Sequence, residues 1–438
     1  MTYGKVGQHK ARSMQGNKHS AKLYGVGCTF LNRRAALLGV AATPLVASTL
    51  AGAKACAAPP AIKVPPQTTG VNGDQGYAPA GSFEVVAEFY GPGPSGVVVS
   101  ENGRVFVGFP RHAINHKGAT LGELVNGRVV PWPSAALSMP SNAAPADRFM
   151  SIHGMTLDTQ GRLWAIDDGK LAGQPLAPGA AKILCLDVAT GKIVYSIVLK
   201  NPTLLPDSHM NDLRVDLTHG SKGTVYVSDS SFGHSPALVV VDVATGQQRR
   251  VLATHPSIQA EEGFMAVVEG VPLVYHAQQK PHFVVGGVDG VTLSPNSDRL
   301  YYAALTSRKL YSLPTALLAN FNVSDAELAA AVQYEGEKGT ADGLATDKQG
   351  RIYTTNFEHD CILRRNTDGT FELMVHDPRI LSPDGIFCTP THVYCTLGQW
   401  NRLASFNNGQ DKRHPPYHLI RFPIEPVAAY NAEGGVNG

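Results

Sequence analysis

Six positions along the 438-residue chain each place a polar side chain before a glycine or aspartate and a short apolar run. They are Ser95, His153, Asn211, Asp289, Asp342 and Asp384. Three carboxylates, an amide and an imidazole that converge would form an oxygen-rich site of the kind that Ca²⁺ prefers. A divalent cation held there could polarise a carbonyl or activate a bound water. The alternative is that Asp-Gly and Asn-Asp pairs only form turns, which these residue types favour.

A second set of polar and aromatic residues follows strand-like segments. It comprises Asp167, Asp168, Asp229, Asn356, Phe357 and Trp400. Aspartate after a strand is commonly a turn or cap residue. Phe357 and Trp400 could stack on an aromatic or amine ligand, or they could fill space between structural units.

The six positions begin six copies of one repeat, and this repeat predicts the elements that position them. Each copy continues with an apolar run of strand length, a turn, and a run rich in β-branched and aromatic residues, which is the pattern of a hairpin. Two further strand-like runs usually follow each hairpin. Four strands per unit, repeated around an axis, are typical of a β-propeller, so the sequence predicts an all-β, six-bladed propeller.

The last copy lacks a good fourth strand after residues 417–424, whereas the segment 83–89 precedes the first copy with no blade of its own. We expect residues 83–89 to complete the last blade, because such closure leaves no open sheet edge. The propeller would then span residues 83–424. Since the first run of each copy should line the central channel, the six polar positions should ring one mouth of that channel.

Two segments interrupt the rhythm of the repeat. Residues 254–288 form a long insert rich in glycine, histidine and valine. In the segment 314–333, Ser324 and Glu327 have capping-box spacing, which predicts a short helix.

The charge of the chain is divided unevenly. Residues 1–55 hold eight basic residues and no acidic one, and without them 29 basic face 35 acidic residues, a net charge of −6. A body with that charge is a poor candidate for nucleic acid, whose binding depends on Lys and Arg. We therefore expect no nucleic-acid partner. Separately, we expect the partner to be a small molecule and the protein to be a monomer.

The basic leader has the features of an export signal. Arg33 and Arg34 precede a modestly apolar run that ends near Ala53, a pattern similar to a twin-arginine signal. Small residues at Ala53 and Ala55 suit cleavage after residue 55 or a few residues later, and an uncleaved anchor is the alternative. Residues 56–82 then form a linker and 425–438 a tail. The predicted location is secreted or periplasmic, with no membrane association after cleavage.

Other motifs carry little chemistry. The glycines from Gly91 to Gly96 spell a dinucleotide pattern, but a strand follows them, and two prolines remove backbone donors. Cys388 and Cys395 flank a predicted turn at diagonal rather than opposite positions, so a bridge is possible but not compelling.

Two segments resemble the major royal jelly/yellow protein family in a bacterial-type version. They are HGMTLDTQGRLWAIDDG at 153–169 and GVDGVTLSPNSDRLYYAALTSRKLYSLPT at 287–315, within a resemblance that spans about residues 83–424. The resemblance implies a secreted six-bladed propeller. Members of this family bind small ligands such as biogenic amines in the channel, and others are linked to dopachrome conversion. Asn356 and Phe357 fall near the family's amine-contacting segment.

The chain is more distantly similar to the gluconolactonase and senescence-marker propellers, whose metal is held by Glu, Asn and Asp around the channel. Asn211 and Asp289 or Asp342 match the Asn and Asp positions, but Ser95 replaces the glutamate of the first blade. This similarity implies Asn211, Asp289 and Asp342 as ligands of a divalent cation such as Ca²⁺.

Three functions follow from these observations. The leading hypothesis is an exported propeller that binds an amine or another cationic or aromatic molecule at the channel mouth through His153, Asn211, Asp289, Asp342, Asp384, Asn356 and Phe357. The second is a metal-dependent lactonase-type hydrolase with water as the nucleophile. The third is a protein-interaction platform, because one propeller fold serves many functions.

Overall fold

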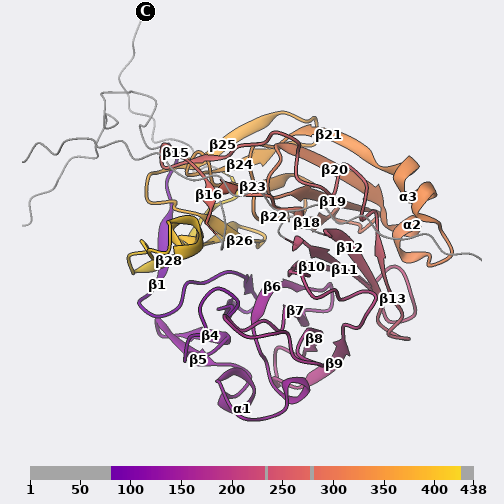
Figure 1. The fold of residues 1–438 in the computed structure, drawn as a ribbon, viewed down its shortest axis with the longest axis horizontal. Coiled ribbons are helices and arrows are strands. Elements are labelled where there is room, and N and C mark those ends of the chain that lie inside the picture. Colours follow the sequence, from indigo (N-terminus) through magenta and orange to yellow (C-terminus); the bar gives the residue numbers. More distant parts are fainter. Residues whose placement is uncertain (1–79, 232–234, 277–280, 426–438) are drawn as a thin grey trace, which may run out of the picture. The chain divides into compact units, whose positions relative to one another are not determined.

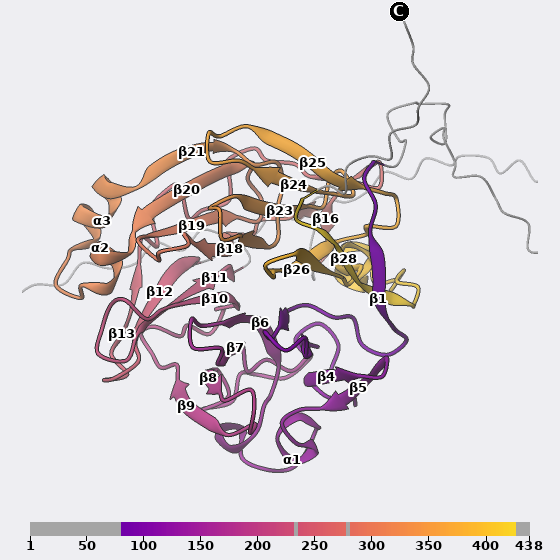
Figure 2. The same cartoon turned by 180° about the vertical axis from the view of Figure 1, so that it is seen from behind.

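The computed structural model describes residues 80–231, 235–276 and 281–425. The export signal predicted for 1–55 and nearly all of the predicted linker and tail lie outside these residues. Six four-stranded antiparallel sheets surround a central axis (Figures 1 and 2), which confirms the predicted six-bladed β-propeller. No helix within the described ranges is long and apolar enough to cross a membrane.

The strands of the first three blades follow the chain from the axis outward. Blade 1 contains β2 (Val97–Val99), β3 (Val105–Gly108), β4 (Leu121–Val125) and β5 (Arg128–Pro131). Blade 2 contains β6 (Ile152–Leu157), β7 (Leu163–Asp167), β8 (Lys182–Leu186) and β9 (Ile193–Val198). Blade 3 contains β10 (Met210–Asp216), β11 (Thr224–Asp229), β12 (Ala237–Asp242) and β13 (Gln248–Val251).

Blades 4 and 5 follow the same order, and blade 6 takes one strand from the other end of the domain. Blade 4 contains β18 (Val288–Leu293), β19 (Arg299–Ala304), β20 (Lys309–Pro314) and β21 (Gln333–Glu337). Blade 5 contains β22 (Leu344–Thr346), β23 (Ile352–Asn356), β24 (Cys361–Arg365) and β25 (Phe371–His376). Blade 6 contains β26 (Pro383–Cys388), β27 (His392–Leu397), β28 (Tyr417–Pro423) and β1 (Glu84–Phe89).

The pairing of β1 with β28 closes the ring. In this antiparallel pair Glu84 lies opposite Arg421 and Phe89 lies opposite Tyr417, and both views place β1 beside β28. The segment 83–89 therefore completes the last blade, as the sequence predicted.

In blades 2 and 5, an aromatic residue of the second strand is hydrogen-bonded to the aspartate that follows the inner strand. Trp164 Nε1 donates to Asp158 Oδ2 over 2.7 Å, and the hydroxyl of Tyr353 donates to Asp347 over 3.1 Å. Both aromatic side chains are fully buried, so their polar atoms need such partners. This explains why these two copies of the repeat combine an aspartate at the end of the first run with an aromatic residue in the second.

Close packing of the inner strands explains the glycine of the repeat. A Cβ atom on Gly343 would lie 2.3 Å from the carbonyl oxygen of Asp384 in the next blade, a distance that real Cβ atoms essentially never show. Four other glycines meet the mouth residue of the following blade in the same way, at 2.2 to 2.6 Å: Gly96, Gly154, Gly290 and Gly385. Only glycine therefore lets neighbouring inner strands approach this closely.

In four blades, the mouth residue and the residue after it interrupt the pairing of the first two strands. The register shifts between Ile152 and Met155, and equivalent shifts occur in blades 3, 4 and 6. The sequence placed these residues before the strand, whereas here they lie inside the strand at an irregularity. Such irregularities re-aim side chains, which in this chain brings them to the channel mouth.

The predicted interruptions form small elements of their own. The 254–288 insert contains two short hairpins, β14 (Val267–Val268) with β15 (Val271–Pro272), and β16 (Val274–Tyr275) with β17 (His282–Phe283). The helices are α1 (Ala135–Ser138), α2 (Thr315–Ala319) and α3 (Asp325–Ala331). Ser324 and Glu327 form the predicted capping box of α3.

Cys388 and Cys395 are free thiols. Cys395 lies opposite Ile386, and Cys388 lies opposite Val393. The two cysteines are therefore diagonal, as expected, and they are not bridged.

Candidate functional site

A pocket of about 950 Å³ opens at the channel mouth. Each blade contributes its mouth residue to the lining, and these residues are the six positions of the repeat: Ser95, His153, Asn211, Asp289, Asp342 and Asp384. Residues far apart in the sequence thus converge because every copy of the repeat presents its first residue to the same mouth.

The two halves of this lining differ in chemistry. Blades 1 to 3 contribute three imidazoles, His112, His153 and His209, whereas blades 4 to 6 contribute the carboxyl groups of Asp289, Asp342 and Asp384. Below the mouth, Arg214 pairs with Asp212 over 2.8 Å and reaches across to the carbonyl oxygen of Leu344 in blade 5.

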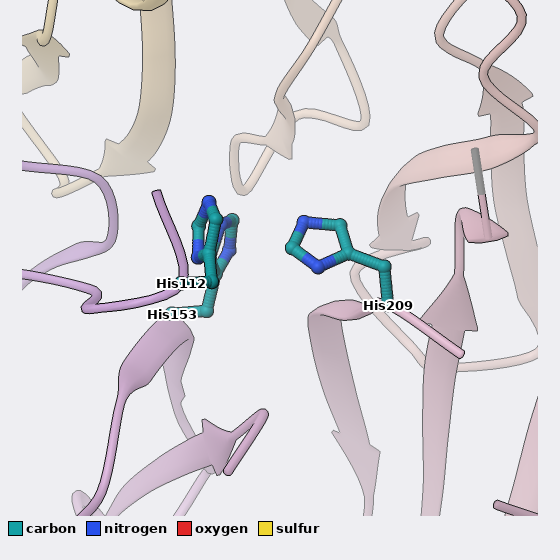
Figure 3. Close-up of side chains that lie close together, drawn as sticks. All are labelled: His112, His153 and His209. Carbon is teal, nitrogen blue, oxygen red and sulfur yellow. The ribbon is translucent and has the colours of Figure 1, made fainter. Parts of the chain in front are cut away.

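The three histidines form a compact cluster. One ring nitrogen from each residue lies within 4.8 Å of the corresponding nitrogens of the other two. The ring centroid of His112 is 5.0 Å from that of His153 and 4.7 Å from that of His209. In Figure 3, His112 and His153 lie close together and His209 lies across from them, with its ring at interplanar angles of 75° and 81° to theirs. Among the described residues, these side chains are the group of possible metal ligands close enough for one ion.

Hydrogen bonds hold the ring of His153 and the backbone of His209. His153 lies in β6, and its Nδ1 is 3.1 Å from the carbonyl oxygen of Asn211. A carbonyl can only accept, so Nδ1 carries the proton and Nε2 is left bare. His209 immediately precedes β10, and its backbone N–H donates to Asp229 Oδ1 over 2.8 Å. Asp229, a candidate from the sequence, thus contacts the backbone that carries His209, and it also pairs with Arg250.

The third ring, His112, belongs to the loop between β3 and β4. The adjacent Arg111 is buried, and its guanidinium donates to the carbonyl oxygens of Met150, Gly118 and Ser138 at 2.7 to 3.0 Å. Burial lowers the pKa of Arg111 to about 10, which leaves it charged at neutral pH. Arg111 thereby ties the His112 loop to blade 2.

A buried carboxylate lies against two of the histidines. Asp168 Oδ2 is 3.3 Å from His112 Nδ1 and 3.7 Å from His209 Nδ1. Neither Asp168 Oδ2 nor His112 Nδ1 has a hydrogen bond of good geometry within the described residues. Asp168, which the sequence placed in its second candidate set, therefore belongs to the histidine half of the pocket.

Electrostatics within this half favour neutral rings. Burial, reinforced by the nearby His112, lowers the pKa of His153 to about 4, and burial with the other two rings lowers the pKa of His209 well below its ordinary value. Burial would raise the pKa of Asp168, but His112 and His153 outweigh it and lower that pKa. Two buried imidazoles, His153 and His209, are therefore neutral at neutral pH, and they lie beside the ionised carboxylate of Asp168.

The acidic half has the opposite tendency. Burial and the repulsion from Asp384 raise the pKa values of Asp289 and Asp342 well above the ordinary range, and burial raises that of Asp384 to about 6. Asp289 Oδ2 also has no hydrogen-bond partner within the described residues. Burial lowers the pKa of Lys338, which interacts with Asp289, to about 7. The charges of these carboxyl groups would be poorly compensated by the side chains around them.

Aromatic side chains complete the lining, and they separate the remaining sequence candidates. Tyr275, Trp400 and Phe406 line the pocket. Phe357 is buried behind them, with its ring 5.3 Å from that of Trp400, and Asn356 accepts a hydrogen bond from Thr340 over 3.0 Å. Neither Asn356 nor Phe357 is among the residues that line the pocket. The structure thus brings five of the seven predicted ligand-binding residues together and places these two behind the wall.

The sequence alone does not single out His112 and His209, because neither stands at a position of the repeat. A usable signal was present. The end of the second strand of a hairpin lies beside the start of its first strand, so residues after β3 reach the same mouth as residues before β2. His209 also stands two residues before Asn211, which the repeat already placed at the mouth.

A family model described as major royal jelly protein matches residues 150–378. No curated protein matches the chain by sequence.

Similar solved structures include a calcium-binding regucalcin from Agrobacterium tumefaciens, with 15% identity and a TM-score of 0.45 over 78% of this chain and 95% of that chain. They also include a putative gluconolactonase, with 12% identity and a TM-score of 0.47 over 78% and 92%, and virginiamycin B lyase from Staphylococcus aureus, with 13% identity and a TM-score of 0.42 over 78% and 100%. These identities are too low to transfer a function from one protein to another.

Proposed function

The chain belongs to the major royal jelly protein family, and we propose that it is an exported protein that binds a small organic cation at the mouth of its propeller channel. The observation that carries this proposal is the convergence of Asp289, Asp342 and Asp384 on one side of the pocket. Export rests on the twin-arginine-type leader, which lies outside the described residues.

Desolvated carboxyl groups favour a cationic ligand. Asp289 and Asp342 are buried, and repulsion among the three groups keeps their pKa values high. An ammonium group placed between them would supply the missing opposite charge and would favour the ionised carboxylates. Binding should therefore release protons near neutral pH.

The size and the aromatic wall of the pocket suit an organic ligand. Its volume of about 950 Å³ lies near the upper end of the range, about 300 to 1,000 Å³, of small-molecule sites. Tyr275, Trp400 and Phe406 present aromatic surface to it. Aromatic faces attract organic cations and stack on aromatic rings, so an aromatic monoamine fits both halves of this description.

Calorimetry with tyramine, compared with the neutral analogue 4-ethylphenol, tests the proposal. We expect tyramine to bind the full-length protein at least tenfold more tightly than 4-ethylphenol, with protons released. Asp342→Asn should weaken tyramine binding about tenfold or more, which corresponds to roughly 1.4 kcal/mol.

The exposed Asp368 provides the matched control, because Asp368→Asn removes a carboxylate outside the pocket. Equal affinity for tyramine and 4-ethylphenol would contradict the proposal. So would equal effects of the two substitutions on tyramine binding.

A metal-dependent hydrolase is the second candidate, and the unpartnered Oδ2 of buried Asp289 favours it. Asn211, Asp289 and Asp342 line one pocket, which is compatible with the predicted divalent-cation site. In that reaction, a water on the ion would be the nucleophile. Lactone hydrolysis that depends on added Ca²⁺ and is lost in Asp289→Asn would support this candidate over simple binding.

A further inference from the structure

We propose that His112, His153 and His209 bind one divalent transition-metal ion of the zinc class, with a coordination position open to the pocket. This site lies on the opposite half of the lining from the three aspartates. It does not depend on the organic cation proposed above.

The geometry of the cluster is close to that of a three-histidine site. Zinc–nitrogen bonds are 2.0–2.1 Å, so the nitrogens of a tetrahedral site lie about 3.4 Å apart. The ring nitrogens here lie within 4.8 Å of one another. Small rotations of the rings would close the difference, and His112 belongs to a loop that is only part-buried.

Partners behind the rings are those that orient metal-binding histidines. A ligating imidazole usually donates its other N–H to a carbonyl or carboxylate. His153 Nδ1 faces the carbonyl oxygen of Asn211, which directs Nε2 to the metal. Asp168 Oδ2 lies within 4 Å of the Nδ1 atoms of His112 and His209.

Two buried polar atoms at the cluster lack hydrogen bonds, and binding of one metal ion would bring them into a hydrogen bond with each other. Asp168 Oδ2 and His112 Nδ1 are 3.3 Å apart but poorly aligned. Unsatisfied buried polar atoms are uncommon in folded proteins and often mark an absent ion or water. A metal ion on His112 Nε2 would rotate the ring and align Nδ1–H with Asp168.

The donor set identifies the class of metal. Imidazole nitrogens suit Zn²⁺, Cu²⁺, Ni²⁺ and Fe²⁺, whereas Ca²⁺ and Mg²⁺ prefer oxygen. Three protein ligands leave a fourth position for water or substrate, as in catalytic zinc sites. Because all three histidines line the 950 Å³ pocket, that position faces the space in which a ligand would lie.

Titration of the metal-free, full-length protein with Zn²⁺ tests the site, with a protein produced without a histidine tag. We expect one tightly bound Zn²⁺ per chain. Asp168→Asn removes a partner of the ligands and should weaken Zn²⁺ binding about 10- to 100-fold. Loss of a ligand should cost more, so we expect a larger decrease in Zn²⁺ affinity for His112→Ala and for His209→Gln.

His116→Ala is the matched control. His116 lies on the same loop as His112 and lines the same pocket, but it is not part of the cluster. We expect this variant to bind Zn²⁺ as the unmodified protein does. Circular dichroism of each metal-free variant shows whether it is folded, and His112→Ala, at a part-exposed position, is the least disruptive of the three. Absence of saturable Zn²⁺ binding, or unchanged affinity in folded His112→Ala and His209→Gln, would overturn the proposal.

Inorganic azide tests the open position. In the Co²⁺-substituted protein, azide should change the visible absorption spectrum by occupying the fourth site. An unchanged spectrum would show that the coordination position is closed and would refute that part of the proposal. If the unmodified protein binds Zn²⁺ but not tyramine, the proposed function is refuted and the metal site is not. If it binds tyramine but not Zn²⁺, the metal site alone is refuted.

Discussion

The carboxyl group of Asp384 makes the acidic half of the pocket sensitive to pH. Burial and the neighbouring Asp212 raise its pKa to about 6 from an ordinary value of 3.8, although His112 and Ser95 act in the opposite direction. The folded chain therefore holds this proton more tightly than the unfolded chain does. The resulting stability is complete below pH 3.8 and is lost as pH rises through 6.

We expect Asp384→Asn to flatten this part of the pH profile. Without ligand, the free energy of unfolding of the unmodified protein should decrease between pH 4 and 7. The decrease should exceed that of the variant by about 2 kcal/mol, a value that allows for the part exposure of the carboxyl group. Denaturant unfolding at several pH values measures this difference. Asp368→Asn serves as the control, and identical profiles for Asp384→Asn and the unmodified protein would refute the account of the acidic half.

At the scale of residues, the sequence anticipated one half of the pocket better than the other. The repeat placed Asp289, Asp342, Asp384, Asn211 and His153 at one mouth, because each copy uses the same backbone position. His112 is not a position of the repeat, and its place after β3 indicates only that it lies near the same mouth. Its position depends on Arg111, whose hydrogen bonds reach carbonyl groups up to 39 residues away, and no local pattern reveals contacts of that kind.

The inner strands position the mouth residues, and their glycines set how closely those strands approach. We expect Gly343→Ala to destabilise the protein by about 1–3 kcal/mol, because the new methyl group would meet the carbonyl oxygen of Asp384 at 2.3 Å. It should also weaken tyramine binding, since Asp342 and Asp384 would be displaced. Thermal unfolding and calorimetry measure the two effects.

Gly91→Ala is the control for this substitution. A Cβ atom on Gly91 meets nothing within 4 Å, and its φ is not positive. Its melting temperature should match that of the unmodified protein. If Gly343→Ala and Gly91→Ala have the same melting temperature, the glycine of the repeat is not required for close approach of the inner strands.

The elements themselves were largely predictable, because hairpins leave a local record of alternating apolar residues and turns. The capping box of α3 was also predictable, because its two residues are only three positions apart in the sequence. The register shifts inside four inner strands could not be predicted, because strand pairing depends on both strands and the sequence of one strand does not determine it. These strands are β6, β10, β18 and β26.

At the scale of the whole domain, the strand β1 joins the two ends of the described chain. Phe89 is buried and packs edge-on against Phe109 with ring centroids 5.3 Å apart, whereas the adjacent Tyr90 is 70% exposed. We expect Phe89→Ala to destabilise the protein by about 3–5 kcal/mol and Tyr90→Ala by less than 1 kcal/mol. Denaturant unfolding of both variants measures the contrast, and equal effects would argue against ring closure through β1.

Six blades and their closure were predictable from the sequence because they follow from counting repeats and unpaired strands. The chemistry at the mouth depends on which side chains the closed ring brings together across blades. Acidic residues from blades 4 to 6 face imidazoles from blades 1 to 3, and this division appears only once the ring is closed.

A crystal structure of the protein grown with tyramine tests the central claim most directly. The account predicts that the ammonium group lies within hydrogen-bond distance of Asp342 or Asp384, with the phenol ring against Trp400, Tyr275 or Phe406. A pocket without ligand at saturating tyramine, or an ammonium group directed away from the three aspartates, would contradict it.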